Sequence, residues 1–136
     1  MASTLKINTL TGVSTAGSIA VTGEGNSTTT NLQQGLAKCW VNFDGDASGA
    51  GARDSFNFSS IADSGTGDYE ISITNAFNTT GFCSTACCEG DSSNDNRSVC
   101  TNNNSTSEVF VNVCVASSGS ASDVDEVHLS THGDLA

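Results

Sequence analysis

The sequence predicts an all-β fold, a small antiparallel β-sandwich or barrel with an extended N-terminal segment. Short apolar runs alternate with polar residues at a period of two, and stretches rich in Gly, Asn, Asp and Ser separate these runs. No segment carries a helical repeat of useful length. The chain has 136 residues, 14 Gly and no Pro, which is the size of one domain and a composition typical of turn-rich β-structure.

The predicted strands share an alternation of buried and exposed side chains. In the first of them Cys39, Val41 and Phe43 would share one face. The strand candidates are residues 36–43, 55–61, 69–77, 108–116 and 126–131. Turn and loop chemistry fills residues 44–54, 62–68 and 89–107. Five or six short strands at this spacing favour a sandwich or barrel.

The domain organisation has two parts. Residues 35–136 would form the sandwich-like surface domain, with a Cys/Asn-rich loop at 83–105. Residues 1–34 would form a docking or trimerisation segment, because they hold too few apolar side chains to fold alone. Within that segment we expect strands at 4–10 and 17–23 and a polar linker at 22–35. The docking or oligomer candidates are Leu5, Ile7, Leu10 and Trp40.

The charge balance argues against anionic partners. The formal net charge is −11, and the four cations are scattered, so they form no basic stripe for nucleic acid or an anionic membrane surface. No stretch approaches the roughly 20 apolar residues that cross a bilayer. The N-terminus has no apolar region of the kind found in secretory signals. We therefore expect synthesis in a cytoplasm and no nucleic-acid or membrane partner.

The six cysteines favour disulfides over a metal centre. They are Cys39, Cys83, Cys87, Cys88, Cys100 and Cys114. Structural zinc sites use paired knuckles, which the CSTACC run lacks. The loop cysteines, from Cys83 to Cys100, are expected to staple the long loop. Cys39 and Cys114 would bridge neighbouring strands or stay buried as small hydrophobes. Zinc and free buried thiols remain the alternatives.

Other candidate sites are weaker. Asp44–Gly49 fits the opening of a calcium loop, but position twelve is Ser55 and no helix flanks it, so a plain turn is favoured. Asp91–Asn96 is an acidic loop that is either solvated or takes a hard cation. His128 and His132 have ligand spacing only if helical. No nucleophile motif occurs. We expect no cofactor, no metal and no enzymatic activity.

Trp40 and Tyr69 are the only Trp and Tyr of the chain. On strands they would fill the core or a subunit interface, which is the favoured interpretation. The alternative is a platform that stacks on sugar rings at a receptor-binding face.

The run GLAKCWVNFDGDASGAGARDSFNFSSIADSGTGDYEISITNAF, together with the N-terminal MASTLKINTL, resembles structural proteins of marine tailed bacteriophages, cyanophages in particular. The recurring pieces are the AK-x-WVNF strand, a Gly/Ala-rich turn, an R-x-S-F-N strand and the GTGDY turn. Residues 37–77 carry the closest likeness. Residues 83–105 lie outside it. The resemblance implies a β-rich, trimeric virion protein on the particle surface, without catalytic residues.

The expected function is capsid decoration, as a cement protein, knob or short head-fibre bound to the major capsid protein or another virion protein. Decoration would stabilise the shell by adding buried area and mass action. One alternative is a short tail-fibre or adhesin head that binds a host surface glycan. Another is a secreted binding module held together by disulfides.

Overall fold

The structure is a computed structural model that describes residues 4–12, 19–23, 28–46, 49–89 and 96–136. The chain divides into two compact units, Met1–Leu36 and Ala37–Ala136. This division lies two residues beyond the boundary expected from the sequence.

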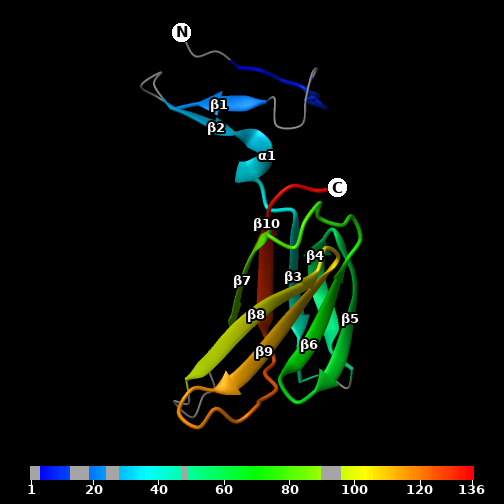
Figure 1. The fold of residues 1–136 in the computed structure, drawn as a ribbon, viewed down its shortest axis with the longest axis vertical. Coiled ribbons are helices and arrows are strands. Elements are labelled where there is room, and N and C mark those ends of the chain that lie inside the picture. Colours follow the sequence, from blue (N-terminus) through cyan, green and yellow to red (C-terminus); the bar gives the residue numbers. More distant parts are fainter. Residues whose placement is uncertain (1–3, 13–18, 24–27, 47–48, 90–95) are drawn as a thin grey trace. The chain divides into compact units, whose positions relative to one another are not determined.

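The N-terminal unit contains a short antiparallel pair, β1 (Ala20–Thr22) and β2 (Thr29–Asn31), and the single helical turn α1 (Leu32–Gly35) (Figure 1). Asn31 starts α1, because its side-chain oxygen accepts a hydrogen bond from the backbone nitrogen of Gln34 at 3.1 Å. The stretch 22–35, expected to be a linker, thus supplies β2 and α1.

The strand expected at residues 4–10 is wrong. Residues 4–12 form no strand, because the alternation of Leu5 and Ile7 creates a strand only where a neighbouring strand pairs with its backbone. The expected strand at 17–23 corresponds to β1. None of the described residues of this unit is buried.

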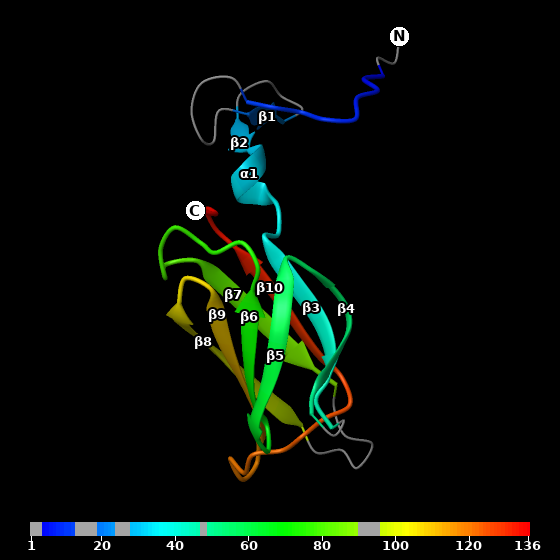
Figure 2. The same ribbon diagram turned by 90° about the vertical axis from the view of Figure 1, so that its right-hand side faces the viewer.

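The larger unit is a sandwich of two four-stranded antiparallel sheets, as the sequence predicts (Figures 1 and 2). The strands are β3 (Cys39–Asp44), β4 (Gly51–Phe56), β5 (Phe58–Gly65), β6 (Asp68–Ile73), β7 (Cys83–Cys88), β8 (Arg97–Ser105), β9 (Glu108–Val115) and β10 (Val127–His132). One sheet, the β3 sheet, has the order β4-β3-β10-β7. The other, the β6 sheet, has the order β5-β6-β9-β8.

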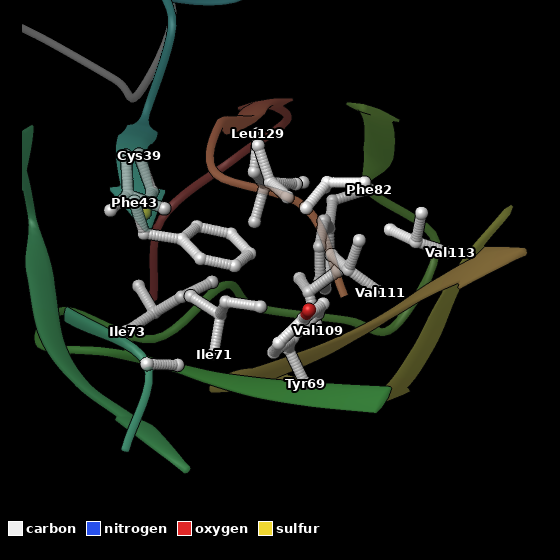
Figure 3. Packing of buried hydrophobic residues seen from close by; sticks show 14 of the residues in the cluster. Cys39, Phe43, Tyr69, Ile71, Ile73, Phe82, Val109, Val111, Val113 and Leu129 are labelled. Carbon is white, nitrogen blue, oxygen red and sulfur yellow. The ribbon is translucent and has the colours of Figure 1, made fainter. Parts of the chain in front are cut away.

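The core lies between the two sheets and is built by their central strands (Figure 3). Every second side chain of β3, β6, β9 and β10 points inward, as the pleat of a strand requires. The β3 sheet contributes Cys39, Val41, Phe43, Val127 and Leu129, all at most 2% exposed. The β6 sheet contributes Tyr69, Ile71, Ile73, Val109, Val111 and Val113. Phe43 and Tyr69 meet edge to face across the core, with ring centroids 5.1 Å apart.

Several edge strands lie where the sequence predicts loops. The first four residues of β4 (residues 51–54) fall within the predicted loop 44–54, and β8 falls within 89–107. β7 is the CSTACC run itself, which was expected to be part of a loop. These strands were missed because edge strands cover the core with few apolar side chains, so their sequences look polar.

The predicted strand 55–61 is in fact a corner between the two sheets. β4 ends at Phe56 in the β3 sheet, and β5 begins at Phe58 in the β6 sheet. Asn57 between them has a positive φ of 56°. Its side chain donates to the carbonyl oxygens of Lys38 (2.9 Å) and Asn75 (3.2 Å). The amide therefore fixes the crossover by bonding to both sides of it.

Candidate functional site

The outer face of the β3 sheet carries aromatic, amide, imidazole and hydroxyl side chains. On β3 the outward residues are Trp40 and Asn42, and on β10 they are His128, Ser130 and His132. The register places these residues in rows across the sheet. His128 lies between Asn42 on β3 and Cys87 on β7, and Ser130 lies between Trp40 and Thr85.

A polar network occupies one end of this face. Oε1 of Glu126 accepts a hydrogen bond from Nδ2 of Asn42 at 2.8 Å. It also lies 3.4 Å from Nε2 of His128 and 3.9 Å from Nη1 of Arg53. The other guanidinium nitrogen of Arg53 lies 3.2 Å from Oδ2 of Asp44.

The ion pairs of this network contribute little to folding. The side chains of Arg53 and Glu126 are 42% and 40% exposed, so water screens their attraction. The network holds polar groups in place on the outer face of the β3 sheet.

An exposed aromatic pair lies next to the network. Trp40 on β3 is directly opposite Phe56 on β4. Trp40 is 37% exposed and Phe56 is 54% exposed. Side chains opposite each other on antiparallel strands have Cβ atoms about 5 Å apart. Trp40 does not lie in the core, because its position on β3 alternates with the buried Cys39 and Val41. Its place in a subunit interface stays a prediction.

Tyr69 lies in the core, as expected, and this excludes the sugar platform imagined for Trp40 and Tyr69 together. Tyr69 is fully buried. Its hydroxyl lies 3.0 Å from the carbonyl oxygen of Gly45 and 3.1 Å from Oδ1 of Asp123. The same carboxylate oxygen accepts a hydrogen bond from the backbone nitrogen of Gly67 at 2.6 Å. Burial, reinforced by Asp123, raises the pKa of Tyr69.

This buried network was not found from the sequence. Asp123 and Gly45 lie 78 positions apart and carry no motif that links them. The one signal for it in the sequence was the GTGDY motif, because its Gly67 and Tyr69 both contact Asp123. The motif is also typical of a turn, and a turn does not require a distant partner such as Asp123.

The cysteines lie mostly along β7 and the neighbouring edge of the β6 sheet. All six are free thiols in the structure, so the disulfides stay a prediction. Cys83 and Cys87 face outward from the same strand, four residues and about 13 Å apart. That separation is too long for a bond between them, because the Cα atoms of a disulfide lie within about 7 Å.

The two strand cysteines lie in different sheets. Cys39 is on β3 and fully buried, whereas Cys114 is half-buried on β9 of the other sheet. Their strands are therefore not neighbours. Burial raises the pKa of the Cys39 thiol from 9.0 to about 11, although Thr131 lowers it in part. Burial also raises the pKa of Cys88.

The cysteines and histidines do not converge on a metal. Cys87 on β7 lies directly opposite His128 on the adjacent strand β10, and Cys83 lies directly opposite His132. Each pair supplies two ligands, and the two pairs lie about 13 Å apart along the strands. Within the described ranges, no group of three or more His, Cys, Asp or Glu is placed to hold an ion. The histidines lie on β10 and not on a helix.

The two acidic loops differ in how far the structure describes them. Asp44 ends β3, where its carboxylate accepts a hydrogen bond from the backbone nitrogen of Asp46 at 3.1 Å and pairs with Arg53. These contacts fit a turn at Asp44–Asp46, while residues 47–48 of the loop lie outside the described residues. Asp91–Asp95, most of the second loop, lie outside the described residues.

The outer face also contains one Ser–His contact. Oγ of Ser130 lies 3.5 Å from Nε2 of His132, and both side chains are on the exposed face of β10. The contact is long for an O–H···N hydrogen bond.

The N-terminal docking candidates all point to solvent. Leu5 is 79% exposed, Ile7 50% and Leu10 55%. Val21 on β1 and Leu36 after α1 are also exposed. These apolar side chains are exposed in a unit whose described residues are all at least partly accessible to solvent.

Comparison with protein families, with curated proteins and with solved structures gives no match for this chain. The protein is classed by its fold alone, as an antiparallel β-sandwich with a small N-terminal unit. None of the described helices is long and apolar enough to span a membrane.

Proposed function

We propose that this protein is a non-enzymatic structural protein on the surface of a bacteriophage particle, where it decorates the capsid as a homotrimer. The observation that carries the proposal is the N-terminal unit. Its described residues bury nothing within the unit, and they expose Leu5, Ile7 and Leu10. Such a unit gains stability when those side chains are buried against another surface.

The resemblance to phage structural proteins supports the same conclusion. The similar residues, 37–77, span two successive hairpins, β3–β4 and β5–β6, which belong to different sheets. The resemblance thus covers half of each sheet. In this assembly the N-terminal unit docks on the major capsid protein or another virion protein, and the sandwich carries the exposed faces.

Trimer formation accounts for the same exposed side chains. Three copies of a unit whose described residues are all unburied can bury Leu5 and Ile7 against one another. Static light scattering at micromolar concentration measures the mass, and three chain masses are expected. A stable monomer that still binds particles would contradict the trimer.

The docking function is tested with particles that lack the protein. Purified chain is added back, and the bound fraction is measured after sedimentation. A variant with Leu5→Ser, Ile7→Ser and Leu10→Ser should bind at least about 100-fold more weakly, because three partly exposed apolar side chains lose about 1 kcal/mol each.

Phe56→Ser serves as the matched control, since it removes an exposed apolar side chain from the sandwich. It should bind particles like the wild type. If instead Phe56→Ser abolishes binding and the triple variant binds normally, the sandwich docks and the N-terminal unit does not. Particles without the protein should also rupture at lower temperature. Unchanged rupture together with lost adsorption would favour the adhesin function.

A further inference from the structure

We propose that the outer face of the β3 sheet binds neutral saccharides, with Trp40 and Phe56 as the stacking surface. The binding site does not depend on the docking of the N-terminal unit, since every residue involved belongs to the sandwich.

The stacking surface is the cross-strand pair itself. Trp40 and Phe56 lie directly opposite each other and are 37% and 54% exposed. Large aromatic side chains exposed side by side leave apolar area in water that a ligand can cover. A pyranose ring offers a flat face of C–H groups, which packs on aromatic rings, and a rim of hydroxyls, which needs polar partners.

Three of those polar partners lie in the next row across the sheet, and the fourth lies in the same row as Trp40. Two residues beyond Trp40 on β3 is Asn42, which lies opposite Asp54 on β4. On its other side, Asn42 lies opposite His128 on β10. Ser130 lies beside Trp40. Together they offer amide, carboxylate, imidazole and hydroxyl groups. Sugar hydroxyls both donate and accept, so this mixture fits them better than a surface of donors alone.

The same groups are held in place by the polar network. Nδ2 of Asn42 donates to Glu126 at 2.8 Å and lies 3.3 Å from Nδ1 of His128. Oδ1 of Asn42 is buried and has no hydrogen-bond partner among the described residues. A fixed amide and imidazole lose little conformational freedom when a ligand binds, which favours affinity.

Charge selects a neutral ligand. Asp44, Asp54 and Glu126 lie on or beside this face with Arg53, which pairs with Asp44 and Glu126. The whole chain carries −11. A sulfated or sialylated glycan would be repelled, and so would a second copy of the same face. The apolar part of this face consists of two side chains, Trp40 and Phe56, whereas the core of a protein–protein interface needs a larger apolar area.

Trp40 is the only Trp of the chain, so its fluorescence reports directly on this face. The full chain is titrated with short neutral oligosaccharides of glucose, galactose and mannose, and with sulfated and sialylated oligosaccharides. A neutral oligosaccharide should shift or quench the emission with saturation, and the anionic ones should bind at least about tenfold more weakly.

Phe56→Ala keeps the Trp40 reporter and removes half of the stacking surface. It should weaken binding by about tenfold or more. Asp54→Ala should weaken it by at least about fivefold through lost hydrogen bonds. Phe110→Ala is the matched control, because Phe110 is the outward aromatic residue of β9 on the opposite sheet. It should bind like the wild type.

Three results would overturn the proposal. One is an emission that no neutral oligosaccharide changes. Another is binding that Phe56→Ala and Phe110→Ala weaken equally. The third is a shift of the Trp40 emission with protein concentration alone, which would mean that a second copy covers this face. Circular dichroism of each variant verifies that the sandwich is intact.

Discussion

Tyr69 and Gly45 join the two sheets of the sandwich through one buried hydrogen bond. The hydroxyl of Tyr69, on β6, lies 3.0 Å from the carbonyl oxygen of Gly45, which directly follows β3. The ring of Tyr69 is fully buried. A single polar atom at the tip of a core side chain thus fixes how the end of the β3 sheet meets the β6 sheet.

Replacing Tyr69 with Phe tests this bond. Tyr69→Phe keeps the edge-to-face contact with Phe43 but leaves the Gly45 carbonyl and the Asp123 carboxylate without the hydroxyl. We expect a loss of about 1–3 kcal/mol in the free energy of unfolding. Urea denaturation measures it through the midpoint at unchanged slope. An unchanged midpoint would mean that water replaces the hydroxyl.

Gly45 should tolerate no side chain. A Cβ at this position would lie 2.5 Å from the hydroxyl oxygen of Tyr69 and 2.9 Å from the carbonyl oxygen of Val124. We expect Gly45→Ala to destabilise the sandwich by about 1–3 kcal/mol through overpacking. Gly51→Ala is the control, because nothing lies within 4 Å of its added Cβ. Equal thermal stability of the two variants would contradict the close contact.

The backbone conformation and the side-chain hydrogen bonds of Asn57 should contribute separately to the stability of the corner. Oδ1 of Asn57 accepts from both nitrogens of Asn75, at 2.8 and 2.9 Å, while the backbone has φ 56°. Asn57→Ala loses the hydrogen bonds and strains the backbone. Asn57→Gly loses only the hydrogen bonds.

We therefore expect Asn57→Ala to cost about 2–3 kcal/mol and Asn57→Gly about 1 kcal/mol less than that. Thermal unfolding of the two variants gives the difference. A glycine variant as unstable as the alanine variant would show that the positive φ contributes nothing.

Alkali should destabilise the sandwich through Cys39. Its pKa is raised from 9.0 to about 11 by burial, so the folded state retains a proton that the unfolded state releases. The stability is complete below pH 9 and falls as the pH rises from 9 to 11, with a slope of at most about 1.4 kcal/mol per pH unit for one group. The raised pKa of Tyr69 adds a further loss of stability that begins near pH 10, the ordinary pKa of tyrosine.

Cys39→Ala separates the two groups. The variant is less stable at pH 8, because a small cavity remains, but its stability should fall less steeply between pH 9 and 11. Urea denaturation across this range measures both slopes. Identical slopes for the variant and the wild type would contradict the buried thiol as the titrating group.

The thiols should differ in reactivity according to burial. Cys83, Cys87 and Cys100 are exposed, whereas Cys39 is buried. Iodoacetamide should label the three exposed thiols of the folded, reduced chain and reach Cys39 only after unfolding. Mass spectrometry of intact particles, with and without reductant, should then show bonded cysteines at the exposed positions. Free thiols with bound zinc would contradict the disulfide prediction.

The sequence predicted the centre of each sheet better than its edges. The four central strands β3, β6, β9 and β10 correspond to the predicted strands 36–43, 69–77, 108–116 and 126–131. Their inward side chains are large and apolar, so the alternation is visible in the sequence. The edge strands β4, β7 and β8 carry Gly, Ser, Asn and Cys, whose pattern is equally typical of loops.

The candidate site was only partly predictable for a related reason. Trp40 was identified as a docking or sugar-binding residue because aromatic residues are rare in this chain. Phe56, which lies opposite Trp40, could not be identified in the same way, because the sequence predicts one continuous strand over residues 55–61. The register between β3 and β4, which places Phe56 opposite Trp40, depends on a turn and a bulge that the sequence does not specify.

The location of the protein on the particle tests the central claim most directly. A cryo-electron microscopy map of the virion, compared with a map of particles that lack the protein, should show difference density of the size of the sandwich, residues 37–136, on the outside of the capsid in groups of three. Difference density at the tail alone, or none on the particle, would contradict capsid decoration.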